Sequence, residues 1–294
     1  MASIGIDIGG TRVKSALVHD GITVATASST APYSRPDRAT LLDSIHDAFV
    51  QLVQQPSAID RGVHAIGVCA PGLFDESSGR FTTCVNLPGL VGLSLENLLA
   101  PTRLTHLPAR LVTDAFAAAT DFAAVTNSQH PRVLALSLGT GVGACVLDRR
   151  SPLLISGRSP GHFGQLDVSL DDQPPIGPDG GAGGLEAYIG LPALTRRFAC
   201  APDDLPTHLA ALTPDSPPLR ALARAIRIGH AIFRPDAVWL LGGIGAALAP
   251  SLPTLRTLVS AHLTSVARNP WELAAATTTF HAAAGAARLA DEVR

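Results

Sequence analysis

Two glycine-rich turns in this chain have the residue types needed to bind a polyphosphate. The first turn contains Asp7, Gly9, Gly10 and Thr11, where one predicted strand turns sharply into the next. Two glycines let the backbone approach an anion with its N–H groups exposed, and Thr11 offers a hydroxyl. Asp7 can hold a magnesium ion through water. Taken alone, this motif is also compatible with an ordinary hairpin turn.

The second turn contains Gly139, Thr140 and Gly141, again between two predicted strands. Because a strand rather than a helix follows each turn, both differ from the P-loop and the Rossmann fingerprint. Two such turns from two halves of the chain can grip one polyphosphate. A further glycine pair, Gly242 and Gly243, follows a short apolar strand and precedes a predicted helix, where it can cap a nucleotide base or ribose.

Asp114 is the candidate catalytic carboxylate, at a predicted junction between a strand and a helix. An aspartate at such a junction is ordinarily an N-cap, which contributes about 1 kcal/mol to stability. A carboxylate with a pKa of about 4 is ionised at neutral pH and can accept a proton from an attacking hydroxyl. The local sequence leaves both roles open.

The elements that must position these residues form two similar series. In the first half, strands are predicted over residues 4–8, 13–18, 22–27 and 65–70 and up to residue 112, with helices over 41–54 and 115–125. In the second half, strands are predicted over 133–138, 142–147, 153–155, 237–241 and 277–283, and helices over 185–198, 219–233, 248–267 and 285–293. The repeated strand, glycine turn and strand indicate an internal duplication of fold. We expect the last helix to pack on the first domain.

Composition narrows the class of protein. The 294 residues are 46% hydrophobic and 16% charged, which favours a well-packed protein of two domains. The formal net charge is −2 without a basic stripe, so we expect no nucleic-acid partner. No apolar stretch is long enough for a membrane span and no secretory signal is evident, so we expect a cytoplasmic protein without a membrane partner.

In their order and separation, these motifs resemble the ROK family of sugar kinases and sugar-responsive repressors, within the actin-like ATPase superfamily. The matching segments are residues 7–11, Ala70-Pro71-Gly72, Asn86-Leu87-Pro88, Asp114-Ala115, residues 138–143, Leu185-Glu186 and Gly242-Gly243. The resemblance implies an α/β protein of two actin-like (ribonuclease H-like) domains with a nucleotide and sugar cleft between them. We expect the N-terminal domain at residues 1–113 plus 284–294 and the C-terminal domain at 114–283.

By this resemblance, Asp114 matches the general base that takes the proton from a sugar hydroxyl attacking the γ-phosphate of Mg-ATP. The expected sugar-binding residues are Gly72, Asn86, Thr113, Asp114, His162, Gln165 and Glu186. The implied activity is that of an ATP-dependent, glucokinase-like hexose kinase acting on O6 of a sugar such as glucose. The family's repressors carry a DNA-binding segment ahead of the first turn, whereas this chain begins at the turn, which favours the kinase branch. Homodimerisation is a further family expectation.

Two sugar-facing positions depart from the family pattern. Thr113 stands where the family usually has Asn, and His162-Phe163-Gly164-Gln165 stands where it has Glu-x-Gly-His. A neutral histidine in place of a carboxylate exchanges a strong acceptor for one donor and one acceptor. The preferred pattern of sugar hydroxyls should therefore shift.

The family's zinc motif is also absent from this sequence. Most members bind structural zinc through that His and three cysteines of a segment aligned here with residues 177–184. Gln165, Gly177, Asp179 and Gly184 occupy the ligand positions, so no thiolate remains and we expect no structural zinc.

Two alternative functions remain. One is a non-catalytic sugar- or nucleotide-binding regulator of the same fold, suggested by the changes at Thr113, His162 and Gln165. The other is phosphoryl transfer to a carboxylate or a glycerol-like acceptor. The intact Asp7, Thr11, Asp114 and Thr140 favour the kinase over the regulator, and Asn86 and Glu186 favour a sugar acceptor.

Overall fold

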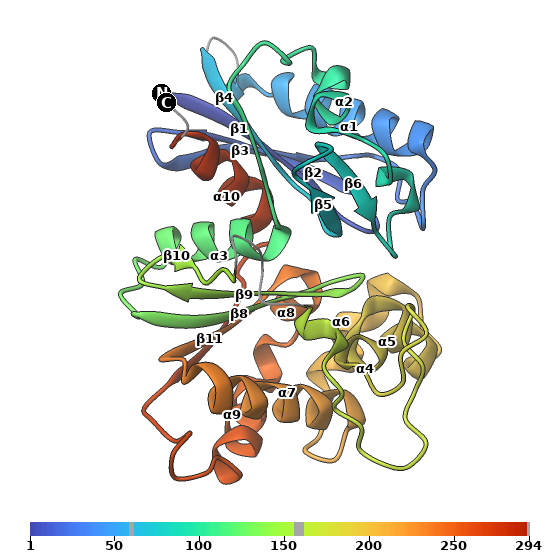
Figure 1. The fold of residues 1–294 in the computed structure, drawn as a ribbon, viewed down its shortest axis with the longest axis vertical. Coiled ribbons are helices and arrows are strands. Elements are labelled where there is room, and N and C mark those ends of the chain that lie inside the picture. The colour runs from blue at the N-terminus through green and yellow to red at the C-terminus, as the bar shows by residue number, and fades with distance from the viewer. Residues whose placement is uncertain (59–61, 156–161, 293–294) are drawn as a thin grey trace. The chain divides into compact units, whose positions relative to one another are not determined.

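The computed structural model describes residues 1–58, 62–155 and 162–292 (Figure 1). The chain forms two compact units, one of Met1–Val125 with Phe280–Arg294 and one of Thr126–Thr279. These bounds differ from the predicted domains at residues 1–113 with 284–294 and at 114–283. The reason is that helix α3 (Asp114–Val125) packs against the last helix, α10 (His281–Ala290), and so belongs to the first unit.

The first unit is built on a five-stranded sheet in the order β3-β2-β1-β4-β7. Strands β1 (Ala2–Ile8), β2 (Val13–His19) and β3 (Ile22–Ser28) are antiparallel neighbours, and β4 (Val63–Cys69) and β7 (Ala109–Val112) continue the sheet parallel to β1. Alternation in β1 directs Ile4, Ile6 and Ile8 into a core shared with helix α1 (Arg38–Val53). The three strands and the helix predicted at the start of the chain are confirmed.

Helix α10 covers the opposite face of this sheet, and its backbone lies directly against the backbone of the strands. A Cβ atom added at Gly5 of β1 would overlap the Ala283 carbonyl, and one at Gly67 of β4 would overlap the Ala286 carbonyl. On its other side, α10 approaches α3 so closely that a Cβ at Gly285 would overlap the Ala117 carbonyl. The expectation that the last helix packs on the first domain is therefore confirmed.

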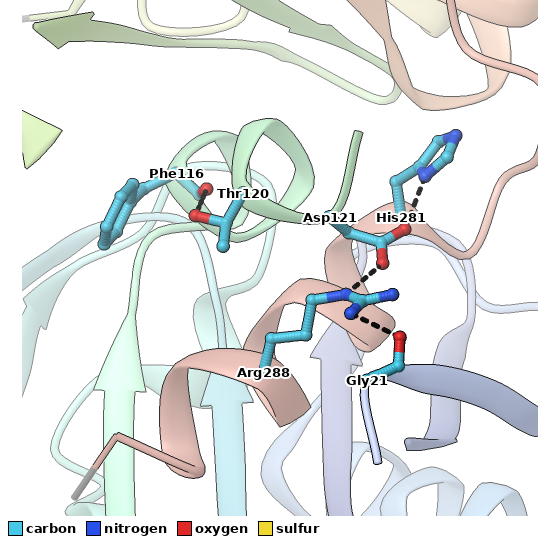
Figure 2. A network of polar contacts seen from close by, with 6 residues as sticks. All are labelled: Gly21, Phe116, Thr120, Asp121, His281 and Arg288. Carbon is cyan, nitrogen blue, oxygen red and sulfur yellow. Dashed lines mark hydrogen bonds and ion pairs between the residues drawn. The ribbon is translucent and has the colours of Figure 1, made fainter. Parts of the chain in front are cut away.

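A buried ionic network joins α3 to α10 (Figure 2). The Asp121 side chain in α3 is 3% exposed, and its two oxygens lie 2.6 Å from His281 Nδ1 and 2.7 Å from Arg288 Nε. Arg288 Nη1 also donates to the carbonyl oxygen of Gly21, at 2.7 Å. Both carboxylate oxygens are thus used, as a buried charge requires.

Smaller elements complete the first unit. They are α2 (Leu95–Leu99), the hairpin of β5 (Leu73–Asp75) and β6 (Arg80–Thr83), and the 3-10 turns Pro56–Ala58, Pro88–Leu90 and Ala100–Thr102. The hairpin places Gly72 and Asn86 at its two ends. None of these elements was predicted from the sequence.

The second unit repeats the strand pattern of the first. Its sheet has the order β10-β9-β8-β11-β12, with β8 (Arg132–Leu138), β9 (Val142–Asp148) and β10 (Ser151–Pro152) antiparallel, and β11 (Ala237–Leu241) and β12 (Glu272–Ala275) parallel to β8. Its helices are α4 (Leu185–Ile189), α5 (Leu191–Phe198), α6 (Leu205–Ala210), α7 (Pro217–Phe233), α8 (Gly242–Ala247) and α9 (Leu252–Ala261), with 3-10 turns at Phe163–Gln165, Pro202–Asp204 and Ala249–Ser251. The shared order supports a duplicated fold. In the described ranges, no helix has the length and apolar character needed to cross a membrane.

Several predicted elements differ from the structure. The strand predicted over residues 277–283 is wrong, because β12 ends at Ala275 and α10 begins at His281. The helix predicted over 185–198 is broken at Gly190, where a Cβ would lie 2.8 Å from the Glu186 carbonyl oxygen. The helix predicted over 248–267 ends at Ala261, and the strand predicted over 153–155 is instead the two-residue strand β10.

The contact between α10 and α3 predicts a large effect of one methyl group. Replacing Gly with Ala inside a helix ordinarily stabilises it by up to about 1 kcal/mol. We expect Gly285→Ala instead to destabilise the protein by about 2 kcal/mol or more, because the new methyl meets backbone that cannot repack. Urea unfolding measures the change. Gly62→Ala, where a Cβ meets nothing within 4 Å, is the control for an uncrowded position. Equal stability of both variants would contradict this packing.

Candidate functional site

The carboxyl ends of three parallel strands place two acidic groups at one edge of the first sheet. Asp7 in β1 pairs with Cys69 in β4, and Cys69 pairs with Val112 at the end of β7. Asp114 follows Val112 by two residues and is the first residue of α3. The strand order thus brings these two predicted residues to the same edge of the sheet, where the Asp114 charge contributes to the raised pKa of Asp7.

Asp7 is an ionisable group in an unfavourable setting. Its side chain is buried, and burial raises its pKa to about 6, with a further contribution from the negative charge of Asp114. The Lys14 ammonium opposes this shift from the adjacent strand, as does the Cys69 thiol, which donates to Asp7 Oδ1 at 3.6 Å. At neutral pH the carboxylate is mostly ionised.

Two carboxylates at one sheet edge are a suitable setting for Mg²⁺, which prefers oxygen ligands and keeps several of its waters. Within the described ranges, no group of three or more His, Cys, Asp or Glu side chains is placed to hold a metal ion. Mg²⁺ is commonly bound through one or two carboxylates together with substrate phosphates.

The first glycine turn presents amide groups to its surroundings. Gly9 N–H donates to the Arg12 carbonyl oxygen at 3.2 Å, which closes the turn between β1 and β2. The N–H groups of Gly10, Thr11 and Arg12 donate to no described group. A turn with several amides that lack a partner among the described residues has the chemistry of an anion site.

The second glycine turn has the same character. Gly139 N–H donates to the Gly141 carbonyl oxygen at 3.0 Å, and the amides of Thr140 and Gly141 have no partner in the part of the chain that is described. Glu186 is buried, and its Oε2 accepts a 2.9 Å hydrogen bond from Val142 N–H, at the end of this turn. Glu186 therefore helps to hold the second turn in place.

The glycine pair after β11 divides into two roles. Gly242 has a φ of +79°, and a Cβ there would overlap the Leu138 carbonyl oxygen, so only glycine fits. At Gly243 an added Cβ would meet nothing within 4 Å, and the residue is exposed. Gly243 thus leaves open space beside the start of α8.

The other predicted sugar-binding residues of the first unit lie in connections that follow its strands. Gly72 has a φ of +103°, and a Cβ there would lie 2.6 Å from the Thr83 carbonyl oxygen. Asn86 is half-buried and follows β6 by three residues. Thr113 is exposed and directly precedes Asp114.

His162 and Gln165 stand at the two ends of a short turn in the second unit. Both side chains are exposed, and Gln165 N–H donates to the His162 carbonyl oxygen at 2.9 Å. Between them, a Cβ at Gly164 would lie 2.5 Å from the Val142 carbonyl oxygen. The structure thus brings the 162–165 segment beside Val142 and hence near Glu186.

Three residues near the first turn were not predicted as functional. Lys14 is the only lysine of the chain and pairs directly with Asp7 across the hairpin. The hairpin register offered this signal, because a turn over residues 9–12 places 7 opposite 14. Cys69 and Tyr33 carried no such local signal, since their contacts depend on distant strands and loops.

The segment aligned with the family's zinc motif is held by its own backbone. Gly177 N–H donates to the Gly181 carbonyl oxygen at 2.7 Å, and Gly183 N–H donates to the Pro175 carbonyl oxygen at 2.9 Å. Asp179 Oδ1 accepts from Gly181 N–H at 3.1 Å. These bonds give the loop a defined course.

Because Gln165, Gly177, Asp179 and Gly184 supply no thiolate, we predict that the purified protein contains no zinc. Elemental analysis should find far less than one zinc per chain, and a strong chelator should leave the Tm unchanged, since a structural zinc site would lose stability on chelation. About one zinc per chain would contradict the prediction.

Burial of Asp7 predicts a gain in stability from Asp7→Asn. The pKa of Asp7 in the folded protein is about 6 against 3.8 for the ordinary group, and each unit is worth about 1.4 kcal/mol. Because the pKa of Asp7 is higher in the folded protein, protonated Asp7 stabilises the folded state below pH 4. This stabilisation is lost as pH rises through 6. We expect Asp7→Asn to be more stable than the natural protein by about 1–3 kcal/mol at pH 7.5, with little difference at pH 4.

Urea unfolding at both pH values measures this effect. Asp43→Asn, which changes an exposed aspartate of α1, is the matched control. A difference between Asp7→Asn and the natural protein that does not change with pH would contradict the assignment.

Sequence comparison finds relatives with sugar-kinase names. N-acetyl-D-glucosamine kinase of Shigella flexneri is 26% identical over 287 residues, covering 90% of this chain and 91% of the relative. N-acetyl-D-glucosamine kinase of Yersinia enterocolitica is 29% identical over 196 residues, covering 63% of this chain but only 61% of that relative. N-acetylmannosamine kinase of Salmonella arizonae is 28% identical over 207 residues, covering 70% and 66%.

Structural comparison confirms the predicted actin-like α/β fold. A ROK family glucokinase from Streptomyces griseus, solved in complex with glucose and AMPPNP, has a TM-score of 0.76 at 20% identity and covers 99% of this chain and 100% of its own. A ROK family transcriptional regulator, a homologue of the Escherichia coli MLC protein, has a TM-score of 0.74 at 17% identity and covers 98% of this chain and 78% of its own. The sequence model of the ROK family matches residues 3–293, so this chain belongs to the ROK family.

Proposed function

We propose that this chain is an ATP-dependent sugar kinase that transfers the γ-phosphoryl group of Mg-ATP to O6 of a hexose such as glucose. The observation that carries the proposal is that Asp7 and Asp114 lie at the same edge of the first sheet, beside a turn whose amides have no partner among the described residues. Phosphoryl transfer asks mainly for positioning and for stabilisation of charge, and these groups provide both. The sugar-kinase relatives support the same activity.

Asp114 is the proposed general base. As the first residue of α3, its place is set by the packing of that helix against α10 and by the Asp121 network. The carboxylate accepts the proton of the sugar hydroxyl as its oxygen attacks the γ-phosphorus. The bond from the γ-phosphorus to the oxygen that bridges it to ADP breaks, and ADP leaves with that electron pair.

Asp7 is the proposed magnesium residue, acting through water, with Asp114 close enough to add its charge. When bound, the magnesium ion supplies positive charge to the phosphate oxygens. The outward amides of Gly10 and Thr11 in the first turn, and of Thr140 and Gly141 in the second, are the proposed phosphate contacts. Gly242 and Gly243 are the proposed contacts to the base or ribose.

Gly72, Asn86, Thr113, His162, Gln165 and Glu186 are the proposed sugar-binding residues. Relatives named for N-acetylglucosamine and N-acetylmannosamine, and a structural neighbour solved with glucose, give the sugars to test first. The exposed side chains of His162 and Gln165 can both donate and accept hydrogen bonds. We therefore expect them to influence which sugar is preferred.

A regulator that binds sugar or nucleotide without turnover is the second candidate. The likeness to a ROK family transcriptional regulator favours it, as do the residues at positions 113, 162 and 165. A protein that no longer catalyses transfer has no need of a general base, so the retained Asp114 favours the kinase.

The kinase proposal predicts sugar-dependent ADP release that requires Asp114. The assay follows magnesium-dependent ADP release from ATP with glucose, mannose, fructose, allose, N-acetylglucosamine and N-acetylmannosamine. We expect at least one sugar to stimulate the rate, and Asp114→Asn to lower that rate by about 10²–10⁴-fold, because it removes the proton acceptor. Asp43→Asn, an exposed change in the same unit, is the matched control and should leave the rate unchanged.

Activity of Asp114→Asn within tenfold of the natural protein would contradict the role of Asp114. Absence of stimulation by every sugar, in a folded protein that binds ATP, would favour the regulator or an acceptor outside the hexoses.

A further inference from the structure

Tyr33 contacts the first glycine turn although it lies 24 residues after Gly9. Its phenol O–H donates to the Gly9 carbonyl oxygen at 2.6 Å, and its backbone N–H donates to the Thr11 carbonyl oxygen at 2.8 Å. Tyr33 thus holds two carbonyl groups of the first glycine turn, one through its side chain and one through its backbone.

These two bonds determine the direction of two amides. In a planar trans peptide, the N–H of one residue points opposite to the C=O of the residue before it. Because the Gly9 and Thr11 carbonyls are directed toward Tyr33, the N–H groups of Gly10 and Arg12 are directed away from it. Neither N–H has a hydrogen-bond partner in the described part of the chain.

The second turn shows the same arrangement with different chemistry. The Gly139 carbonyl oxygen accepts a 3.0 Å hydrogen bond from Leu191 N–H, which directs the Thr140 N–H to the opposite side. There a backbone amide at the start of α5 holds the carbonyl, whereas in the first turn a tyrosine side chain does so. The two turns therefore have the same kind of support at their first glycine.

The environment keeps the Tyr33 phenol in its donor form. Burial raises the pKa of this phenol, and the negative charge of Asp7 raises it further. The O–H bond to Gly9 therefore persists well above neutral pH.

A second contact strengthens the same support. Arg12 Nη1 donates to the Ser29 carbonyl oxygen at 2.6 Å and also to the Thr30 carbonyl oxygen. The turn is thus tied at three of its residues to the segment 29–33 that follows β3.

We propose that Tyr33 is a positioning residue of the first turn, holding the Gly9 and Thr11 carbonyls back so that the Gly10 and Arg12 amides face the phosphates of a nucleotide. The inference rests on the proposed function, because it needs a nucleotide polyphosphate as the ligand of the turn. Tyr33 also packs beside the core of the first unit, so its test must separate positioning from packing.

Tyr33→Phe removes only the phenol oxygen and keeps the ring in the core. We expect the Kd of ATP with magnesium, measured by calorimetry without sugar, to rise about three- to tenfold, as loss of one well-formed hydrogen bond predicts. In the kinase assay, the KM for ATP should rise while the KM for sugar stays unchanged. A loss of packing would instead lower the Tm and affect both substrates.

Tyr188→Phe is the matched control, because Tyr188 is the only other tyrosine and its phenol oxygen accepts from Leu170 N–H in the second unit. It should leave the Kd of ATP unchanged. Arg12→Gln, which removes the other side-chain contact of the turn, should also weaken ATP binding selectively and provides a second test if Tyr33→Phe folds poorly.

The outcomes separate the inference from the proposed function. If the natural protein binds ATP and Tyr33→Phe binds it equally well, the positioning role is wrong and the kinase proposal stands. If the natural protein does not bind ATP, both are wrong. A selective rise in the Kd and KM of ATP supports the positioning role.

Discussion

Backbone contact between α10 and its two neighbours is the constraint on which the first unit depends. Gly5 and Gly67 let the helix lie directly on β1 and β4, and Gly285 lets it meet α3. Asp121 then joins the helices through a buried ionic network with no oxygen left over. Because α3 begins at Asp114, about two turns before Asp121, the same packing sets the place of the candidate base.

At the carboxyl edge of the first sheet, ionisable groups lie close together around the buried Asp7. Asp7 lies among Asp114, Lys14 and Cys69, in a setting that disfavours its ionised form. A carboxylate kept in such a place costs stability, a pattern typical of functional sites. The glycine turn beside it adds uncharged amide donors, so the edge combines groups that attract a cation with groups that attract phosphate oxygens.

Local patterns were sufficient for much of the fold. Alternating residues with a glycine turn predicted both hairpins, and a short apolar run before two glycines predicted the strand Ala237–Leu241, because these are short-range signals. Patterns failed where long-range contacts decide. A strand was predicted over 277–283, yet β12 is the segment that pairs with β11. The helix predicted over 185–198 is interrupted at Gly190, whose backbone is extended, with a ψ of 152°, before a second helix begins at Leu191.

For the candidate site too, some features follow from local sequence and others from long-range contacts. Sequence alone was enough to name the two turns, Asp7, Asp114 and the ROK family, since these depend on residue type, spacing and local register. Only the tertiary structure brought Asp114 to Asp7, Tyr33 to the Gly9 carbonyl and Arg288 to Asp121. The hydrogen-bonded pairs join residues 24 and 167 positions apart, and their strength depends on burial. Burial is a property of the packed chain that no local pattern encodes.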